Sequence, residues 1–349
     1  MITSKSSPTS VLIDNTRPRY DTEGNPVDAH DGCLEFFEGR YWLYGTAYGA
    51  TTGFRTTNRY RIYSSVDLAQ QGWTFHGEAL RETPYGLHVR PYVKRCPATG
   101  KYVMWYNYFT DWKGETDWAN GDGPVLPVVH RVAVADHPAG AFETVTQQAA
   151  TRYPYTGDHG LFVDHDGTGY LIYTTPGADF KLTIERLRDD FLDTTGEGTE
   201  PLAEEVEAPA LFARGAWYYA LFDQLCCFRA WGSGARVYRA SHPLGPWEYR
   251  GNINRRRSGP LQHVRDFSGD IIIPAQQTHI AHLPTAGDDV FIWMGDRWQT
   301  GGSDRRGADL QFWSEPLRFT ADGDIEPLRF VERWTLTHGM PMRQTYNPE

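Results

Sequence analysis

The sequence is poor in cysteine, has no long apolar run and carries more acidic than basic residues. Four cysteines in 349 residues are too few for a disulfide scaffold, and none has the paired spacing of a zinc site. We expect free buried thiols at Cys33, Cys96, Cys226 and Cys227. No stretch approaches the roughly 20 apolar residues that span a bilayer, so we expect no membrane association. The formal net charge of −10 argues against a nucleic-acid partner, because phosphate binding requires a basic surface.

The N-terminus likewise lacks a secretory signal, because MITSKSSPTS contains no apolar core segment. We expect a cytoplasmic protein, or a secreted one from which a signal has been removed. A composition of 40% hydrophobic and 22% charged residues is typical of a soluble globular chain. Aromatic residues are abundant at 14%, and flat aromatic rings suit the apolar faces of sugars.

Amphipathic helical periods are scarce, and one strand pattern recurs instead. A Gly or Asp turn is followed by a dense run of aromatic and β-branched residues, which favours short strands. The five copies are GRYWLYGT from Gly39, GKYVMWYN from Gly100, GTGYLIYTT from Gly167, GAWYYALFD from Gly215 and DDVFIWMGD from Asp288. A second strand and a Gly-containing turn follow, most clearly from Arg61, His130 and Ala235.

Five units of roughly 50–70 residues with about four strands each predict an all-β fold, a five-bladed β-propeller. An irregular pair of β-sandwiches is the alternative, but it does not explain five copies of one pattern. No linker rich in Pro, Gly or Ser divides the chain, so we expect residues 1–349 to form one domain.

Three acidic residues occupy corresponding places ahead of these aromatic strands. Asp31 precedes the first run, Asp158 the third and Glu207 the fourth. The innermost strand of each propeller blade lines the channel, so equivalent strand ends meet at one mouth. A carboxylate held there against rings is partly desolvated, which raises its pKa. Inverting glycosidases need one protonated and one ionised carboxylate on opposite sides of a sugar. The alternative is that each acidic residue caps a strand end; three at matching places favour catalysis.

At these residues the sequence resembles glycoside hydrolase family 43, and most closely its exo-β-1,3-galactanase branch. The matching segments include AHDGCLEFFEGRYWLYG, VRPYVKRCPATGKYVMWYN, GDHGLFVDHDGTGYLIY, EAPALFARGAWYY, AQQTHI and FIWMGDRW. The resemblance implies a five-bladed propeller and single-displacement hydrolysis. It also implies that Glu207 is the general acid, that Asp158 orients the acid and tunes its pKa, and that Asp31 is the general base.

The chain departs from the galactanase branch at three places. That branch usually has Gly where this chain has Asp31, Glu where it has Val89 and Arg where it has Gly157. We therefore expect an inverting exo-acting hydrolase, first of β-galactosides, with an α-L-arabinofuranosidase or a β-xylosidase as the alternative. A non-catalytic carbohydrate-binding propeller and a protein-interaction propeller are the alternatives from other classes. Neither of them needs three converging carboxylates.

Further residues are candidates for contacts with an oligosaccharide or polysaccharide substrate. They are His30, Arg90, Trp231, Gln276 and Arg297. His30 has the alternative of a hydrogen-bonded core histidine, and Arg90 that of a strand-end ion pair. The resemblance favours Gln276 over Gln277, and it makes Arg297 a pocket residue that Asp296 orients. Among the tryptophans of polar loops, we expect at least one to stack on sugar; these are Trp112, Trp118 and Trp231.

We expect no required cofactor and no catalytic metal, because no ligand cluster in the sequence demands one. Some members of the family hold a calcium ion or a histidine in the propeller channel. His263 or His279 could occupy that place here. DHDGTG from Asp164 resembles a calcium loop but lacks the further ligands, so it predicts a hairpin turn.

Overall fold

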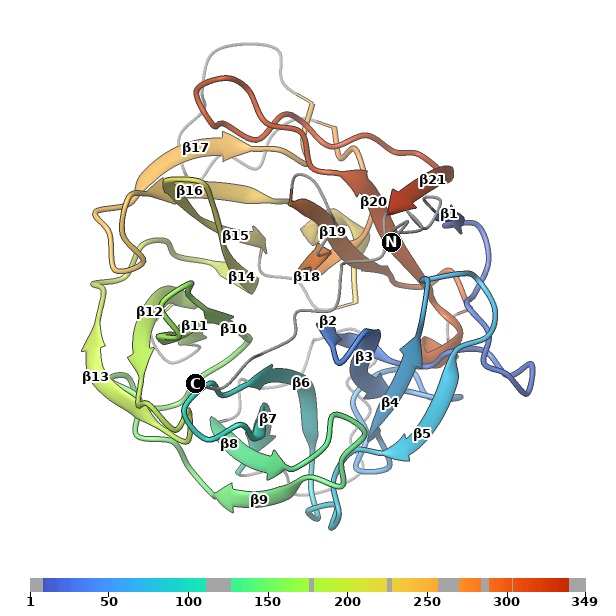
Figure 1. The fold of residues 1–349 in the computed structure, drawn as a ribbon, viewed down its shortest axis with the longest axis horizontal. Coiled ribbons are helices and arrows are strands. Elements are labelled where there is room, and N and C mark those ends of the chain that lie inside the picture. The colour runs from blue at the N-terminus through green and yellow to red at the C-terminus, as the bar shows by residue number, and fades with distance from the viewer. Residues whose placement is uncertain are drawn as a thin grey trace, which may run out of the picture.

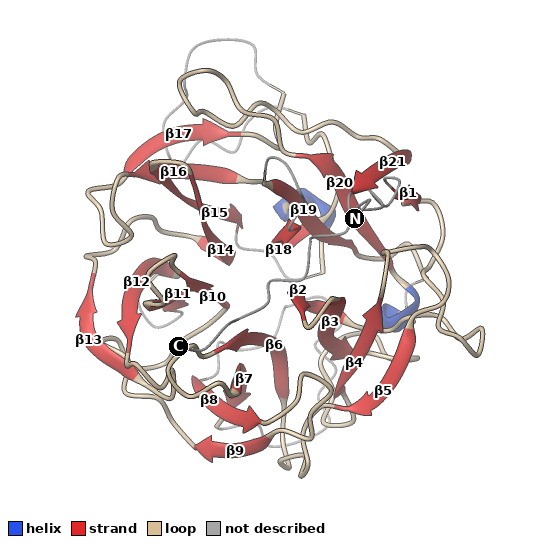
Figure 2. Cartoon of the chain, viewed as in Figure 1, coloured by secondary structure: helices blue, strands red, loops and turns tan. Residues whose placement is uncertain are grey.

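Five sheets surround a central axis in the computed structural model (Figure 1). The structure describes residues 9–110, 127–175, 179–224, 228–256, 270–283, 289–302 and 304–338. Within these ranges there is no α-helix, and only two single 3-10 turns interrupt the strands and loops (Figure 2). No described helix is long and apolar enough to cross a membrane. The prediction of an all-β, five-bladed propeller is confirmed.

Each of the first four blades is an antiparallel sheet of four strands in chain order. Blade 1 contains β2 (His30–Phe37), β3 (Arg40–Ala47), β4 (Arg59–Ser65) and β5 (Thr74–Glu78). Blade 2 contains β6 (His88–Arg95), β7 (Tyr102–Phe109), β8 (Val128–Ala135) and β9 (Glu143–Thr146). Blade 3 contains β10 (His159–Val163), β11 (Gly169–Thr175), β12 (Lys181–Leu187) and β13 (Thr194–Gly198). Blade 4 contains β14 (Val206–Arg214), β15 (Trp217–Gln224), β16 (Arg236–Ala240) and β17 (Glu248–Asn252).

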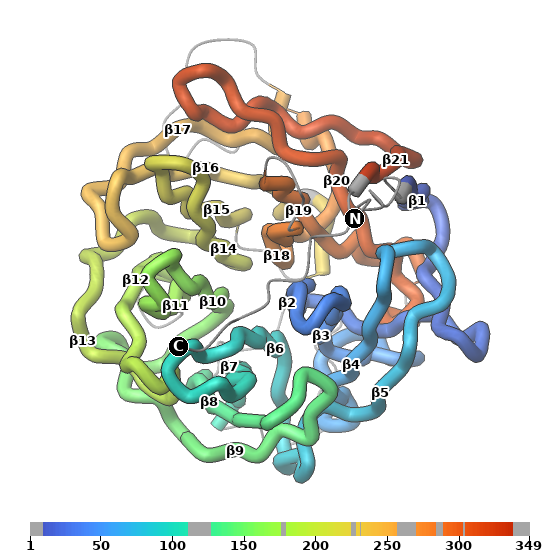
Figure 3. The backbone as a smooth tube through the Cα atoms, in the orientation of Figure 1, coloured from blue at the N-terminus to red at the C-terminus, as the bar shows by residue number. Residues whose placement is uncertain are grey.

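The fifth blade differs from the expected four strands. Its sheet has three: β18 (Gln276–Leu283), β19 (Val290–Arg297) and β20 (Leu310–Pro316). Beside it, β1 (Thr9–Asp14) pairs with β21 (Arg333–His338) in a separate two-stranded sheet (Figure 3). The Asn15 carboxamide donates to the Trp313 carbonyl and accepts from the Trp313 amide, both at 2.9 Å. The first strand is thereby fastened to the last blade, which closes the ring.

The repeated aromatic runs form the second strand of every blade, and their side chains fill the core. Five of their large residues are almost completely buried: Tyr44, Trp105, Tyr173, Phe222 and Trp293. The largest apolar clusters each combine residues of neighbouring blades, so the core lies between the sheets. The turn predicted at Asp164 is also present, with the Gly167 amide donating to the Asp164 carbonyl at 2.9 Å. Cys33 and Cys96 are free and buried, as expected, and Cys226 and Cys227 lie outside the described residues.

The innermost strands carry irregularities where the functional residues lie. β2, β6, β14 and β18 each contain a bulge within their first few residues. Asp31, Arg90 and Ala208 lie in three of these bulges, with φ of 51°, 60° and 49°. A bulge re-aims the side chains beside it, and a non-glycine residue at positive φ costs about 1–3 kcal/mol. Surrounding contacts must therefore hold these backbones in place.

Candidate active site

All three predicted carboxylates lie at the beginning of innermost strands. Asp31 is the second residue of β2, Glu207 is the second residue of β14, and Asp158 immediately precedes β10. These strands come from blades 1, 4 and 3, which surround the centre of the propeller (Figure 1). The side chain of Asp158 is 23% exposed, whereas Asp31 and Glu207 are buried. Solvent therefore reaches the group on the side of Asp158.

Arg90 on β6 is the buried cation of this group. Its Nη1 lies 3.5 Å from Asp158 Oδ2, and its Nε and Nη2 donate to the carbonyls of His159 and Thr278 at 3.1 and 3.3 Å. Burial alone would lower the pKa of Arg90, but the neighbouring carboxylates, first Asp158, raise it above its usual value. The guanidinium therefore stays charged and ties blades 2, 3 and 5 together at the mouth of the channel.

Glu207 is held through its neighbours on both sides. Gln276 Nε2 donates to Glu207 Oε2 at 3.1 Å, and Trp298 Nε1 in turn donates to Gln276 Oε1 at 2.7 Å. The amide of Ala208, the next residue along β14, donates to Asp158 Oδ2 at 3.1 Å. Asp158 thus fixes the strained backbone beside Glu207, and Gln276 fixes its carboxyl group.

Two hydrogen bonds hold Asp31, one to its carboxyl group and one from its backbone amide. Its Oδ2 accepts a 2.6 Å hydrogen bond from the Tyr48 hydroxyl, and its amide donates to Asp296 Oδ2 at 2.8 Å. Burial raises the pKa of Asp31 to about 7, against the lowering effect of hydrogen bonds from Tyr48 and Thr46 and of the charge on Arg90. A carboxyl group with this pKa can take up a proton near neutral pH.

His30 lies behind Asp31 and is completely buried. Its Nδ1 is 2.8 Å from Asp296 Oδ1, and its ring centroid is 5.4 Å from that of Trp298. Burial by itself would lower the pKa of His30, but Asp296 and then Asp28 raise it to about 9. The structure therefore places a charged, hydrogen-bonded histidine at this position.

Two other candidates lie elsewhere or cannot be placed. Arg297 follows Asp296 on β19, and successive strand residues point to opposite faces. Its guanidinium carbon lies 5.3 Å from the centroid of the Phe330 ring, so the structure places it away from the carboxylates rather than beside them. The side chain of Trp231 lies outside the described part of the chain, as do Trp112, Trp118 and His263.

A fourth carboxyl group, Asp223, was not singled out from the sequence. It ends the aromatic run of blade 4 and lies directly opposite Glu207 in the β14–β15 ladder. Burial, followed by the charges of Glu207 and Asp158, raises the pKa of Asp223 well above its usual value. Its Oδ2 accepts from the Gln277 amide at 3.0 Å. The Gln277 side chain donates to the carbonyls of Ala208 and Leu221, so Gln276 and not Gln277 contacts Glu207.

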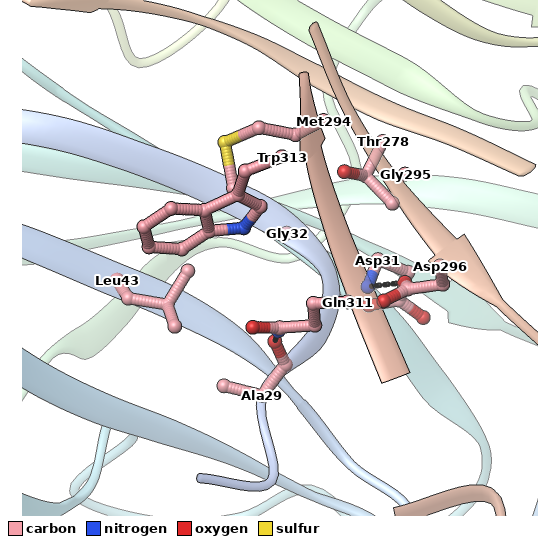
Figure 4. A pocket seen from close by; sticks show the side chains of 10 residues that line it. All are labelled: Ala29, Asp31, Gly32, Leu43, Thr278, Met294, Gly295, Asp296, Gln311 and Trp313. Atoms are coloured by element: carbon pink, nitrogen blue, oxygen red, sulfur yellow. Dashed lines mark hydrogen bonds between the residues drawn. The ribbon is translucent and has the colours of Figure 1, made fainter. Parts of the chain in front are cut away.

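A small hollow lies behind Asp31 between blades 1 and 5 (Figure 4). It measures about 10 Å³, which is room for roughly one water molecule. Polar side chains around it come from β2, β18, β19 and β20; they are Asp31, Thr278, Asp296 and Gln311. A sugar ring does not fit this space, so the hollow is not the substrate site.

A second charged group lies deeper in the channel. Lys94 Nζ is 2.6 Å from Glu35 Oε1, and His279 Nε2 is 3.4 Å from the same oxygen. The Lys94 ammonium already occupies the place where a calcium ion would meet this carboxylate, so these residues do not fit a metal site. No cluster of three or more His, Cys, Asp or Glu able to hold a metal ion occurs among the described residues.

The sequence matches the model of glycosyl hydrolases family 43 over residues 44–266, more than half of the chain. The chain belongs to this family. Among solved structures, a family 43 β-1,3-galactosidase with galactodeoxynojirimycin is 26% identical, with a TM-score of 0.74. The alignment covers 92% of this chain and 99% of that one. No curated protein matches the sequence.

Two longer family 43 structures share the fold. Another β-1,3-galactosidase is 23% identical, with a TM-score of 0.72, and the alignment covers 94% of this chain and 64% of that one. An exo-β-1,3-galactanase from Clostridium thermocellum is 22% identical with the same TM-score, and the coverage is 92% and 66%. This family 43 chain thus spans about two thirds of the length of these two relatives.

The chain also departs from the galactanase branch at Val89 and Gly157, and both residues make contacts within the fold. The side chain of Val89 packs in an apolar cluster with Leu87, Phe109 and Val128. Gly157 donates its amide to the Thr174 carbonyl at 2.7 Å, and its own carbonyl lies 3.1 Å from a ring nitrogen of His130. Val89 therefore packs inside the protein through its side chain, and Gly157 forms hydrogen bonds inside it through its backbone.

Proposed function

We propose that this family 43 member is an inverting glycoside hydrolase whose acid is Glu207 and whose base is Asp31. The supporting observation is that Arg90 and Asp158 lie between the two groups: Arg90 pairs with Asp158 at 3.5 Å, its charge lowers the pKa of Asp31, and Asp158 accepts from the amide next to Glu207. Asp31 and Glu207 come from blades 1 and 4, which are not neighbours in the ring. Inverting enzymes require such separation, with their two carboxyl groups roughly 6.5–9.5 Å apart.

The reaction is a single displacement. Glu207 gives its proton to the glycosidic oxygen as the bond from that oxygen to the anomeric carbon breaks. Asp31 takes a proton from a water molecule as the oxygen of that water bonds to the opposite face of the anomeric carbon. Asp158 orients Glu207 through the Ala208 amide, and Arg90 pairs with Asp158 at 3.5 Å. The sugar leaves with inverted configuration, and one proton has moved from acid to product while one has moved from water to base.

For the substrate we propose terminal β-galactosyl residues, released one at a time. Support comes from the 26% identical family 43 structure, which is a β-1,3-galactosidase with galactodeoxynojirimycin. Asp31, Val89 and Gly157 distinguish this chain from the galactanase branch, so arabinofuranosides and xylosides remain the competing substrates.

Hydrolysis of galacto-, arabino- and xylo-oligosaccharides, followed by chromatography of the products over time, tests this proposal. We expect monomeric galactose to accumulate from the first time point of the β-1,3-galacto-oligosaccharide reaction. Faster release of arabinose or xylose would change the sugar but keep the mechanism. If the protein binds one of the three oligosaccharides but hydrolyses none of them, it is a carbohydrate-binding propeller and not an enzyme.

A further inference from the structure

A ring of polar contacts, made of hydrogen bonds and one 3.9 Å ion pair, passes through Asp31. Asp296 accepts from the Asp31 amide through Oδ2 and from His30 through Oδ1, both at 2.8 Å. His30 Nε2 faces Asp28 Oδ1 at 3.9 Å, and Asp28 accepts the amides of Tyr48 and Gly49 at 2.9 and 2.8 Å. The Tyr48 hydroxyl then returns to Asp31 Oδ2 at 2.6 Å. The ring therefore holds both the backbone and the carboxyl group of the same residue.

The members of this ring are buried and include groups of opposite charge. His30 is completely buried, and Asp28 and Asp296 are 6% and 1% exposed. An imidazolium between two carboxylates offsets part of the cost of burying three charges. Removing either carboxylate would weaken the hold on the His30 imidazolium, because both raise its pKa.

Asp31 needs such support because of its backbone. It lies in the β2 bulge with φ of 51°, a conformation that costs a non-glycine residue about 1–3 kcal/mol. A ladder partner does not hold the bulged amide, and Asp296 from blade 5 accepts its hydrogen bond instead. The direction of the Asp31 side chain therefore depends on Asp296, a residue of another blade that is only 1% exposed.

We propose that Asp296, held by its pairing with His30, is the positioning residue of the general base. It fixes the angle at which the Asp31 carboxylate meets the attacking water. This inference rests on the proposed function, because it assumes that Asp31 is the base.

The electrostatic consequence is specific to this arrangement. Charged and titratable groups from four elements and one loop face Asp31. They are Arg90 and Tyr92 on β6, Asp296 on β19, Tyr60 on β4, His30 on β2 and Tyr48 in the loop after β3. The charge of Asp296 raises the pKa of Asp31, so its removal moves the acid limb of the pH profile to lower pH.

The test is a double-mutant cycle of Asp296→Asn and Asp31→Ala, with kcat/KM measured across pH. An Asn side chain has one acceptor for two donors, so the Asp31 backbone or His30 loses its bond. We expect Asp296→Asn to lower kcat/KM roughly 10- to 100-fold, as a small displacement of a reacting group does. In the Asp31→Ala background we expect no further loss, because Asp296 acts only through Asp31.

A matched control is Asp289→Asn. Asp289 also pairs with a histidine, His282, at 2.9 Å, but both side chains are more than half exposed. We expect the control to leave kcat/KM and its pH profile unchanged. If Asp296→Asn fails to fold by circular dichroism, His30→Asn replaces it. This second variant keeps a donor for Asp296 and removes the cation, and we expect the same non-additivity with Asp31→Ala.

Independent losses that multiply in the double variant would overturn the positioning role. A uniform drop in kcat/KM without a shift of the acid limb would also overturn it, because that is the signature of a structural defect. Full activity of Asp31→Ala itself contradicts the proposed function instead, so the two failures are distinguishable.

Discussion

The propeller channel contains two buried charged groups, and they differ in how far cations offset their carboxyl groups. At the mouth, Asp158 lies 3.5 Å from the guanidinium of Arg90, the charges of Asp31 and Asp223 also act on it, and Glu207 lies opposite Asp223 in the β14–β15 ladder. Deeper, and four residues further along β2 and β6, Glu35 pairs with Lys94 at 2.6 Å and with His279 at 3.4 Å. β2 and β6 thus carry one group that is rich in carboxyl groups and, about 13 Å further along the strands, a second group whose carboxylate is paired with a lysine.

The protonation of the two groups follows from this difference. At the mouth, burial raises the pKa of Asp31 to about 7 and that of Asp223 well above its usual value. In the deeper group, burial also favours the neutral acid, but Lys94 and His279 outweigh it and lower the pKa of Glu35. An excess of carboxylates suits proton transfer, whereas a matched ion pair suits a structural joint between blades.

The largest expected effect is the loss of the acid at the mouth. Glu207→Ala should lower kcat at least ~10²-fold on an oligosaccharide with a poor leaving group, because such a group needs a proton as it departs. On a nitrophenyl glycoside, whose leaving group needs little protonation, the loss should be smaller. Steady-state kinetics on both substrates measure the difference, and equal losses would remove Glu207 from the role of acid.

Breaking the deeper group should instead affect stability. Lys94→Met leaves Glu35 buried beside His279 alone, and removing one partner of a buried pair costs about 3 kcal/mol. The matched control is Lys101→Met on the same blade, because Lys101 pairs with Asp136 at an exposed site. Urea unfolding should show a lower midpoint for the first variant only. A reduced kcat in fully folded Lys94→Met would contradict the division between the two groups.

The pH dependence sharpens the comparison. Asp31 must be ionised to act as the base, so kcat/KM should fall as pH decreases through about 7. The Tyr48 hydrogen bond lowers the pKa of Asp31, and Tyr48→Phe should therefore move this acid limb upward by about one pH unit. A pH series of kcat/KM for both proteins measures it; an unchanged or downward limb would show that another group controls the profile.

The smallest effect is expected from chelators. Since Lys94 compensates Glu35, incubation with EDTA should leave the melting temperature and kcat unchanged. Restoration of a lost activity by added calcium would show that a metal site contributes after all.

The fold could be predicted because its signal is local. Aromatic runs such as those from Gly39 and Gly100 form the second strand of a blade, and a hairpin turn precedes each. The three-stranded fifth sheet could not be predicted, because the pairing of β1 with β21 joins residues more than 300 positions apart.

The site could be predicted only in part. Asp31, Asp158 and Glu207 could be found because they begin strands at equivalent places. Bulges place Asp31 and Arg90 at positive φ. Because neither residue is a glycine, the sequence gives no sign of this backbone conformation. Asp296 and Arg297 are neighbours in sequence, and only the strand's register decides which one faces Asp31. Tyr48 and Asp223 reach the carboxylates through tertiary contacts alone.

Proton NMR of the first-formed anomer tests the central claim most directly. With Glu207 as acid and Asp31 as base on opposite sides of the sugar, a β-galactoside should first yield α-galactose, which then equilibrates to the mixture of anomers. Initial release of β-galactose would mean that a carboxylate attacks the sugar itself, and it would contradict the account of this site.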